Sequence, residues 1–233
     1  MSGSTYVLIP GAGGDARYWQ WVIPFLTDGG NAAIAVALPA DDDAAGLATY
    51  TDCVCEAAAD VRGPVILVAQ SMGGFTAPLV AQRRRTDLIV LLNAMVPAPG
   101  ESGAQWWQTT GQKQASAEYL HRIGLGRSEF DFVEDFFHDV PEDVKRVVVS
   151  SPEPRQSDTP FAQPWPLDNW PSVPTRFLQG ADDRLFPLEF QRRVVRERLG
   201  IDVDIMPGGH LLAFSRPREL AEKLESYRRA AGL

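Results

Sequence analysis

The sequence of 233 residues contains few cysteines, few histidines and no long hydrophobic segment. Its two cysteines, Cys53 and Cys55, are separated by one residue within a segment of helical character, so their side chains point to different faces. They therefore cannot form a normal disulfide with each other. No histidine or further cysteine lies nearby to complete a metal site. We expect no disulfide, no metal centre and no cofactor, and this cysteine content is typical of a reducing compartment.

Positive charge is also scarce. The formal net charge is −8 and the pI is about 4.9, whereas binding to nucleic acid needs clustered lysine and arginine. The one basic run, Arg83, Arg84 and Arg85, falls where a helix is expected to end, and cations there interact favourably with the helix dipole. We therefore expect no nucleic-acid partner.

Long apolar segments are missing as well. No stretch approaches the roughly 20 apolar residues of a membrane-spanning helix. Residues 1–5 supply neither the basic region nor the apolar region of a secretory signal peptide. We expect a cytoplasmic protein that does not associate with membranes. The sequence contains no extended coiled-coil repeat and leaves the oligomeric state open.

Six short apolar runs, bounded by Gly, Pro, Asn or Asp, predict buried strands. Helix-like segments separate them, which is the pattern of an α/β protein with a mostly parallel sheet covered by helices on both faces. We predict a single domain over residues 1–233. The expected strands are residues 6–9, 32–38, 65–69, 88–92, 175–179 and 203–206, and the clearest helices are residues 44–61, 72–84, 188–199 and 217–230.

The fourth and fifth expected strands are separated by about 80 residues, far more than a crossover helix requires. This segment is rich in phenylalanine and tryptophan, and its second half is rich in proline. We predict a cap inserted between these strands at about residues 98–171. Within it, residues 128–140 are expected to form an amphipathic helix, because Phe130, Val133 and Phe137 recur at helical spacing.

The segment AQSMGG at residues 69–74 follows the third expected strand and precedes an expected helix. In the pattern Gly-x-Ser-x-Gly, a sharp turn between a strand and a helix exposes the serine hydroxyl for nucleophilic attack. Ala69 takes the place of the first glycine, where a small side chain suffices. An isolated serine can simply cap a helix, but the preceding strand and the glycine pair favour Ser71 as a nucleophile.

A serine hydroxyl is an effective nucleophile only when a base takes its proton, and the chain contains three histidines. His210 follows the last expected strand in a glycine-rich loop, which places it at the carboxyl ends of the strands, where open α/β sheets bind ligands. His121 and His138 lie inside the insertion and are interpreted as helix residues without a catalytic role. We predict that His210 is the base.

The base needs a carboxylate that fixes its tautomer, and the expected order along the chain is serine, acid, histidine. Two aspartates, Asp182 and Asp183, follow the fifth expected strand. The spacing Gly-x-x-Asp-x-x-x-Pro, from Gly180 to Pro187, matches the acid loop of many serine hydrolases and selects Asp183. Asp182 is the alternative, although an exposed turn aspartate that bonds its own backbone is the simpler interpretation for it.

Acyl transfer also requires donors for the developing oxyanion, usually one N–H just after the nucleophile and one from the loop after the first strand. Met72 supplies the first donor, and Ala12, in the glycine-rich segment 10–14, is our choice for the second. A phosphate-binding loop is the rival interpretation. It is disfavoured because the segment has neither Gly-Lys-Ser/Thr nor Gly-x-Gly-x-x-Gly with an acidic residue about 20 positions later.

Together these motifs resemble the α/β-hydrolase superfamily over essentially the whole chain, and within it the branch of plant methylesterases and hydroxynitrile lyases. The resemblance implies the α/β-hydrolase fold, a six-stranded sheet with a cap between the fourth and fifth strands. It is carried by residues 7–12 with Trp19, and by residues 65–74, 91–97 and 208–210.

This chain departs from that branch in two places. Pro10 stands where the branch usually has histidine, and the cap matches only in outline, so the resemblance implies no particular substrate. The lyases typically have a lysine just after the catalytic histidine, which handles cyanide. Here Leu211 follows His210. That difference favours ester hydrolysis over cleavage of cyanohydrins.

We therefore predict a serine esterase that cleaves a small apolar or aromatic carboxylic ester through an acyl-enzyme. Its partner is then a small-molecule ester, with a substrate pocket formed by Trp106, Trp107, Phe186 and Leu211. Two alternatives stay open at this point. The first is a small-molecule receptor with the same fold and little turnover. The second is an enzyme with lyase, thioesterase, lactonase or cofactor-free oxygenase chemistry, and the motifs do not separate these reactions.

Overall fold

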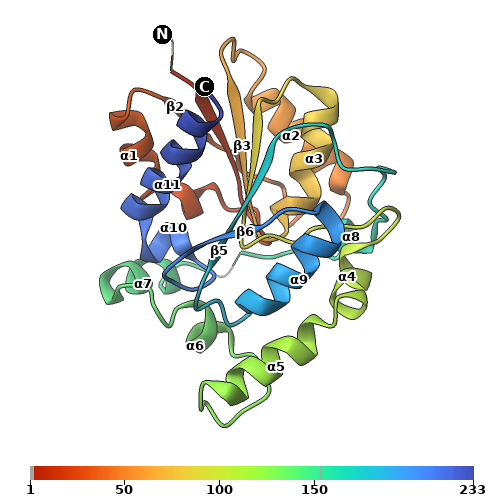
Figure 1. Ribbon diagram of the computed structural model, residues 1–233, viewed down its shortest axis with the longest axis vertical. Coiled ribbons are helices and arrows are strands. Elements are labelled where there is room, and N and C mark those ends of the chain that lie inside the picture. Colours follow the sequence, from red (N-terminus) through yellow and green to blue (C-terminus); the bar gives the residue numbers. More distant parts are fainter. Residues whose placement is uncertain (1–2, 153) are drawn as a thin grey trace.

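A parallel sheet runs through the middle of the structure, with helices on both of its faces (Figure 1). The computed structural model describes residues 3–152 and 154–233. Its six strands lie in the order β2-β1-β3-β4-β5-β6, and every neighbouring pair is parallel. The strands are β1 (Thr5–Ile9), β2 (Ala32–Ala35), β3 (Val65–Gln70), β4 (Leu88–Leu92), β5 (Thr175–Gly180) and β6 (Val203–Met206). The predicted six-stranded parallel α/β fold is confirmed.

Alternate residues of the central strands enter two separate cores. In β1, Val7 and Ile9 pack with α2 (Leu47–Ala57), α3 (Gly73–Arg83) and α9 (Leu188–Leu199) on one face of the sheet. Tyr6 and Leu8 pack on the opposite face with α1 (Ile23–Asp28) and α11 (Pro217–Ala230). Because both faces are covered, the central strands β1, β3 and β4 are apolar at nearly every position, which is why they are visible in the sequence as continuous runs.

Two predicted elements are longer than those observed. The expected strand 32–38 ends at Ala35, because the N–H of Val36 makes the last bond to β1 and the N–H of Leu38 turns to Gly14 O at 2.9 Å. The expected helix 44–61 is reduced to Leu47–Ala57, because Ala45 closes a turn with Asp42 instead. The helices expected at 188–199 and 217–230 have the predicted bounds, and α3 differs from its prediction by one residue at each end.

The segment between β4 and β5 crosses the carboxyl ends of the strands (Figure 1). It contains α4 (Gly103–Thr109), α5 (Gln112–Arg122), α6 (Phe132–Phe136), α7 (Glu142–Val149) and α8 (Thr159–Ala162). We call this segment the cap; its exact boundaries at residues 98 and 171 stay a prediction.

The amphipathic helix expected over 128–140 is wrong. Only the short α6 forms, because Asp131 is extended and its side chain caps the helix at Glu134 N, 2.7 Å away. The supposed apolar stripe is also split, since Val133 is exposed and Phe137 is buried.

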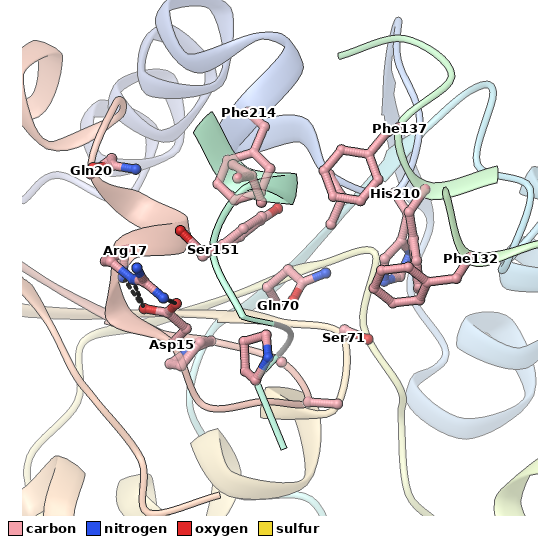
Figure 2. Close-up of a pocket in the computed structure, with 18 of the residues that line it drawn as sticks. Asp15, Arg17, Gln20, Gln70, Ser71, Phe132, Phe137, Ser151, His210 and Phe214 are labelled. Carbon is pink, nitrogen blue, oxygen red and sulfur yellow. Dashed lines mark hydrogen bonds and ion pairs between the residues drawn. The ribbon is translucent and has the colours of Figure 1, made fainter. Parts of the chain in front are cut away.

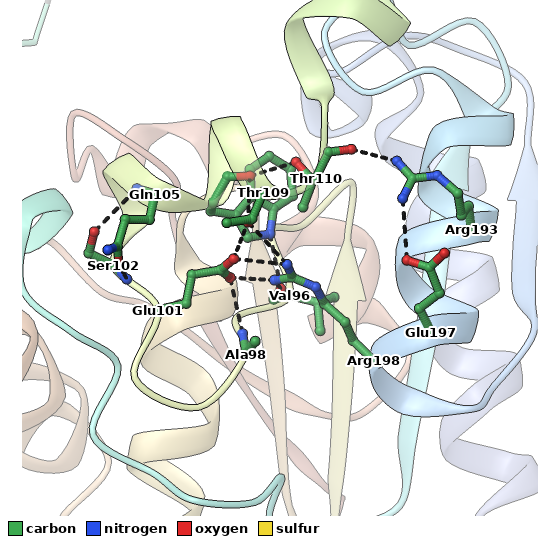
Figure 3. Close-up of polar contacts among 11 residues, drawn as sticks. Val96, Ala98, Glu101, Ser102, Gln105, Thr109, Thr110, Arg193, Glu197 and Arg198 are labelled. Atoms are coloured by element: carbon green, nitrogen blue, oxygen red, sulfur yellow. Dashed lines mark hydrogen bonds and ion pairs between the residues drawn. The ribbon is translucent and has the colours of Figure 1, made fainter.

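A partly buried ion pair, Glu101–Arg198, links the start of the cap to α9 (Figure 3). The Glu101 carboxylate accepts hydrogen bonds from both terminal nitrogens of Arg198, one of them at 2.9 Å, and also from Thr109 and the N–H of Ala98. Burial by itself would raise the pKa of Glu101, but the hydrogen bonds from Arg198, Thr109 and Ala98 outweigh it and lower that pKa.

In the ranges described, no helix has the length and apolar character needed to cross a membrane.

Candidate active site

The turn between β3 and α3 holds Ser71 in a left-handed backbone conformation, with φ of 51°. Such a conformation costs a non-glycine residue about 1–3 kcal/mol and persists only where the surroundings enforce it. Here the Ser71 N–H donates to Leu92 O at 3.1 Å, and the Ser71 carbonyl accepts from Met95 N at 2.9 Å. Backbone contacts with the end of β4 therefore hold the serine in place.

Two glycines allow the backbones around Ser71 to approach one another. A Cβ on Gly74 would lie 1.9 Å from the carbonyl oxygen of Met95, so no side chain fits there. A Cβ on Gly11 would lie 2.8 Å from Cβ of Ser71. The loop after β1 is thus pressed directly against the serine, and the glycines in both motifs are explained by close contact.

His210 and Asp183 form a buried pair. Nδ1 of His210 lies 2.8 Å from Oδ2 of Asp183, and their side chains are only 2% and 0% exposed. Oδ1 of Asp183 accepts the N–H groups of Leu185 and Phe186, both at 2.9 Å, and Oδ2 also accepts from Gln179 Nε2 at 3.1 Å. The carboxylate is therefore held in one orientation, facing the imidazole.

Asp182, the alternative acid, does not contact His210. Its Oδ2 accepts the N–H of Gly208 at 3.1 Å, and its own N–H donates to Gly208 O at 2.9 Å. Its carboxylate therefore connects the loop after β5 to the loop after β6. Of the other two histidines, His121 lies in α5, and His138 lies against Gly209.

Ser71 and His210 line one cavity of about 390 Å³ at the carboxyl ends of the strands (Figure 2). Ala12 and Leu211 line it as well. Most of its other walls are apolar and come from the cap and from α10 (Leu212–Ser215). These apolar residues are Phe132, Phe136, Phe137, Val147, Val148 and Phe214.

The polar end of the cavity carries two opposite charges, Asp15 and Arg17. They form an ion pair, with Nε of Arg17 2.8 Å from Oδ2 of Asp15 (Figure 2). Burial opposes ionisation of Asp15, but its hydrogen bonds with Arg17 prevail and lower the pKa of the carboxyl. The two charges therefore compensate one another at this end of the cavity.

The predicted oxyanion donors lie beside Ser71. Met72 immediately precedes the first residue of α3, and Ala12 belongs to the loop that touches Ser71 through Gly11. Within residues 3–152 and 154–233, the N–H groups of Ala12 and Met72 have no hydrogen-bond acceptor. Both remain available to an oxygen atom bound in front of Ser71.

The four residues predicted to form the substrate pocket do not all line this cavity. Leu211 lines the cavity, whereas Trp106, Trp107 and Phe186 do not. Trp106 is fully buried, and its indole N–H donates to Val96 O at 2.9 Å. Phe186 is fully buried behind the site, with its ring edge-on to His210 at 5.2 Å between centroids. These aromatics pack the cap onto the sheet.

The aromatic walls contributed by α6 are missing from the predicted set. The ring centroids of Phe136 and His210 are 5.2 Å apart. The ring of Phe132 packs against those of Phe136 and Phe137, and all three phenylalanines line the cavity. The sequence signal was present, since these residues stand in the aromatic-rich insertion. It did not show which aromatics face the cavity.

An ion-pair cluster that no sequence motif indicates holds α6 against the acid loop. Asp135, which is fully buried, binds both terminal nitrogens of Arg127 at 2.6 and 2.7 Å and also Arg184 at 3.2 Å. Burial of Asp135 would raise the pKa of its carboxyl, but the hydrogen bonds outweigh it and lower that pKa. Arg184 directly follows Asp183, so the helix carrying Phe136 is tied to the loop of the acid.

The parallel sheet, the strand-turn-helix around Ser71 and the cap define this chain structurally as an α/β-hydrolase. A family model described as "Alpha/beta hydrolase family" matches residues 6–223, and the chain belongs to this family. No match was found among curated proteins.

Solved structures with the same fold align over nearly the whole chain. A pyrethroid hydrolase from Sphingobium faniae JZ-2 has a TM-score of 0.75 at 22% identity, covering 97% of this chain and 98% of its own. Polyneuridine aldehyde esterase has a TM-score of 0.76 at 20% identity, covering 97% and 99%. A variant of tomato methylketone synthase I has a TM-score of 0.72 at 15% identity, covering 99% of both chains. At these identities the similarity shows that the fold is shared.

Proposed function

We propose that this protein is a serine esterase that hydrolyses a small, neutral carboxylic ester with an apolar or aromatic group. One observation carries the proposal: the buried Asp183–His210 pair opens, through His210, into the same cavity as Ser71. An activated serine needs a base within reach and an acid that orients the base. The names of two structural neighbours, a pyrethroid hydrolase and an esterase, are in line with ester hydrolysis.

In the proposed mechanism, Oγ of Ser71 attacks the ester carbonyl carbon while Nε2 of His210 takes the hydroxyl proton. The N–H groups of Ala12 and Met72 stabilise the negative oxygen of the tetrahedral intermediate. His210 then gives the proton to the departing alcohol, which leaves Ser71 acylated. Water, deprotonated by His210, attacks the acyl-enzyme, and His210 returns the proton to Oγ of Ser71 as the carboxylic acid leaves. Asp183 holds the imidazole in the required tautomer and stabilises the imidazolium.

The walls of the cavity support the substrate class. About 390 Å³ lies within the range of small-molecule sites, roughly 300–1,000 Å³. The aromatic and aliphatic walls suit an apolar group. Asp15 and Arg17 pair with each other, so neither charge is left free to bind a charged ligand. Leu211 next to His210 cannot supply the cation that a lyase needs for cyanide.

A fluorophosphonate probe tests the activated serine directly. We expect the wild-type protein to be labelled and Ser71→Ala not to be. Ser151→Ala is the matched control, because Ser151 lines the same cavity but does not lie on the turn, and it should still be labelled. Hydrolysis of neutral p-nitrophenyl esters should fall on the order of 10⁶-fold in kcat for Ser71→Ala. Unlabelled wild-type protein, or a preference for charged acyl groups, would contradict the proposal.

A further inference from the structure

Asn93 is a fully buried residue at the end of β4, and the proposed mechanism does not use it. Its side chain joins two loops. Oδ1 accepts the N–H of Gly180 at 2.7 Å, while Nδ2 donates to the carbonyls of Gly209 and His210 at 3.0 and 2.9 Å. A single amide group therefore spans the start of the acid loop and the backbone of the histidine itself.

The backbone around Asn93 holds the third element of the site. Its neighbour Leu92 accepts the Ser71 N–H, and Met95 donates to the Ser71 carbonyl. The N–H of Asn93 itself donates to Leu178 O in β5 at 2.9 Å. The segment 92–95 thus contacts the serine turn through its backbone, and the loops of the acid and the histidine through one side chain.

We propose that Asn93 is a positioning residue that fixes His210 relative to Asp183 and Ser71. This inference rests on the proposed esterase function. Other side chains also brace the histidine loop, Asp182 at Gly208 N and Asp139 at Gly209 N. Among the described residues, however, Asn93 is the side chain that bonds to the backbone of His210. Displacement of the imidazole by about 1 Å can cost 10²-fold in rate.

Asparagine meets two demands at this position that few residues combine. Its φ of 44° lies in the left-handed region, which asparagine tolerates better than most side chains. Its short amide supplies an acceptor and two donor hydrogens, which match one N–H and two carbonyls. Aspartate would keep the acceptor but present an oxygen to the two carbonyl oxygens. Glycine would keep the backbone conformation and lose all three bonds.

Asn93→Gly is therefore the principal test, because it removes the hydrogen bonds without straining the backbone. We expect kcat for a p-nitrophenyl ester to fall about 10²-fold, with KM changed by less than about threefold. In a proton NMR spectrum, the downfield resonance of the His210 N–H bound to Asp183, identified by its loss in Asp183→Asn, should shift or broaden. A purely structural role would not move this resonance in the folded protein.

Asn31→Gly is the matched control. Asn31 is also buried, accepts Ser4 N at 3.2 Å and donates to Glu225 at 2.8 Å, but it precedes β2 at the opposite end of the sheet. It should lower the melting temperature while keeping the wild-type kcat and the downfield resonance. If Asn93→Gly does not fold, Asn93→Asp undergoes the same measurements, with the same loss of kcat expected.

Three outcomes would overturn the inference. They are a wild-type kcat in the folded Asn93 variant, a change in KM alone, and an equal loss of kcat in Asn31→Gly. Failure of the proposed esterase function gives a different result. In that case the fluorophosphonate does not label the wild-type protein, or Ser71→Ala retains the ester hydrolysis of the wild type, whatever the Asn93 variants do.

Discussion

Replacement of Asp183 by asparagine tests the proposed triad at its most constrained point. Oδ1 of Asp183 accepts two backbone N–H groups, from Leu185 and Phe186, so the amide oxygen of the variant must take that place. The new NH₂ group is then directed at Nδ1 of His210. The imidazole must accept this hydrogen bond at Nδ1 and carry its own proton on Nε2, where it cannot receive the proton of Ser71.

The expected loss follows from this wrong tautomer. In a comparable triad the same change lowers kcat about 10⁴-fold, which corresponds to roughly 5.4 kcal/mol of activation free energy at 1.36 kcal/mol per factor of ten. The variant should also lose some stability, because the NH₂ group faces Nε2 of Gln179, which donates to Oδ2 in the wild type. Initial rates of p-nitrophenyl ester hydrolysis measure the first effect, and urea unfolding measures the second.

Asp182→Asn is the control for this experiment. The Asp182 carboxylate accepts the N–H of Gly208, and an amide oxygen can accept it equally well. We expect a loss in kcat of less than about tenfold. A loss of less than tenfold in Asp183→Asn, or a larger loss in Asp182→Asn, would refute the assignment of the acid.

Four further predictions concern stability, pH dependence, specificity and the serine turn. Glu101→Ala should lower the free energy of unfolding by about 1–3 kcal/mol in a urea titration, because it leaves the partly buried guanidinium of Arg198 without its carboxylate partner. The pKa of Glu101 is lower in the folded protein than in the unfolded chain, where it is near 4.5. The ionised carboxylate therefore contributes its full stabilisation above about pH 4.5, and this stabilisation is lost as the pH falls through the folded pKa. Between about pH 7 and pH 3 the free energy of unfolding should thus depend less on pH in Glu101→Gln than in the wild type, and an equal pH dependence would contradict this. Phe136→Ala should raise KM for aryl esters more than for acetyl esters in steady-state assays, by about tenfold for a lost aromatic contact of roughly 1.4 kcal/mol. Gly74→Ala should abolish fluorophosphonate labelling or soluble expression, because its Cβ would overlap the carbonyl oxygen of Met95.

The sequence predicted those parts of the fold that depend on local pattern. The central strands β1, β3 and β4 are covered on both faces and form nearly continuous apolar runs, whereas β5 and β6 also contain polar residues such as Arg176 and Asp204. The strand expected over 32–38 was too long because a tertiary bond, from Leu38 N to Gly14 O, ends it. No local signal marks such an end. The cytoplasmic location remains a prediction that the fold does not address.

The site shows the same division between local and tertiary information. Ser71, Asp183 and His210 each stand at a strand end with a recognisable loop, and the structure brings the last two into contact. The cavity walls were harder to predict, because Trp106 and Phe136 are both aromatic residues of one insertion. Only the packing of the cap decides that Trp106 faces the core and Phe136 faces the cavity. The role of Asn93 depends on three loops that are distant in sequence.

The close contacts at Gly11 and Gly74 limit how this protein can change in evolution. Around Ser71 there is no room for a Cβ, because one would overlap the Met95 carbonyl oxygen at Gly74 and the side chains of Gln70 and Ser71 at Gly11. Substitutions there therefore mostly destroy the site instead of altering it. The cap wall is made of side chains that can be exchanged one at a time. In directed evolution or natural divergence, new substrate preferences should therefore arise from substitutions such as those at Phe132, Phe136 and Val147, while the glycines beside the serine stay fixed.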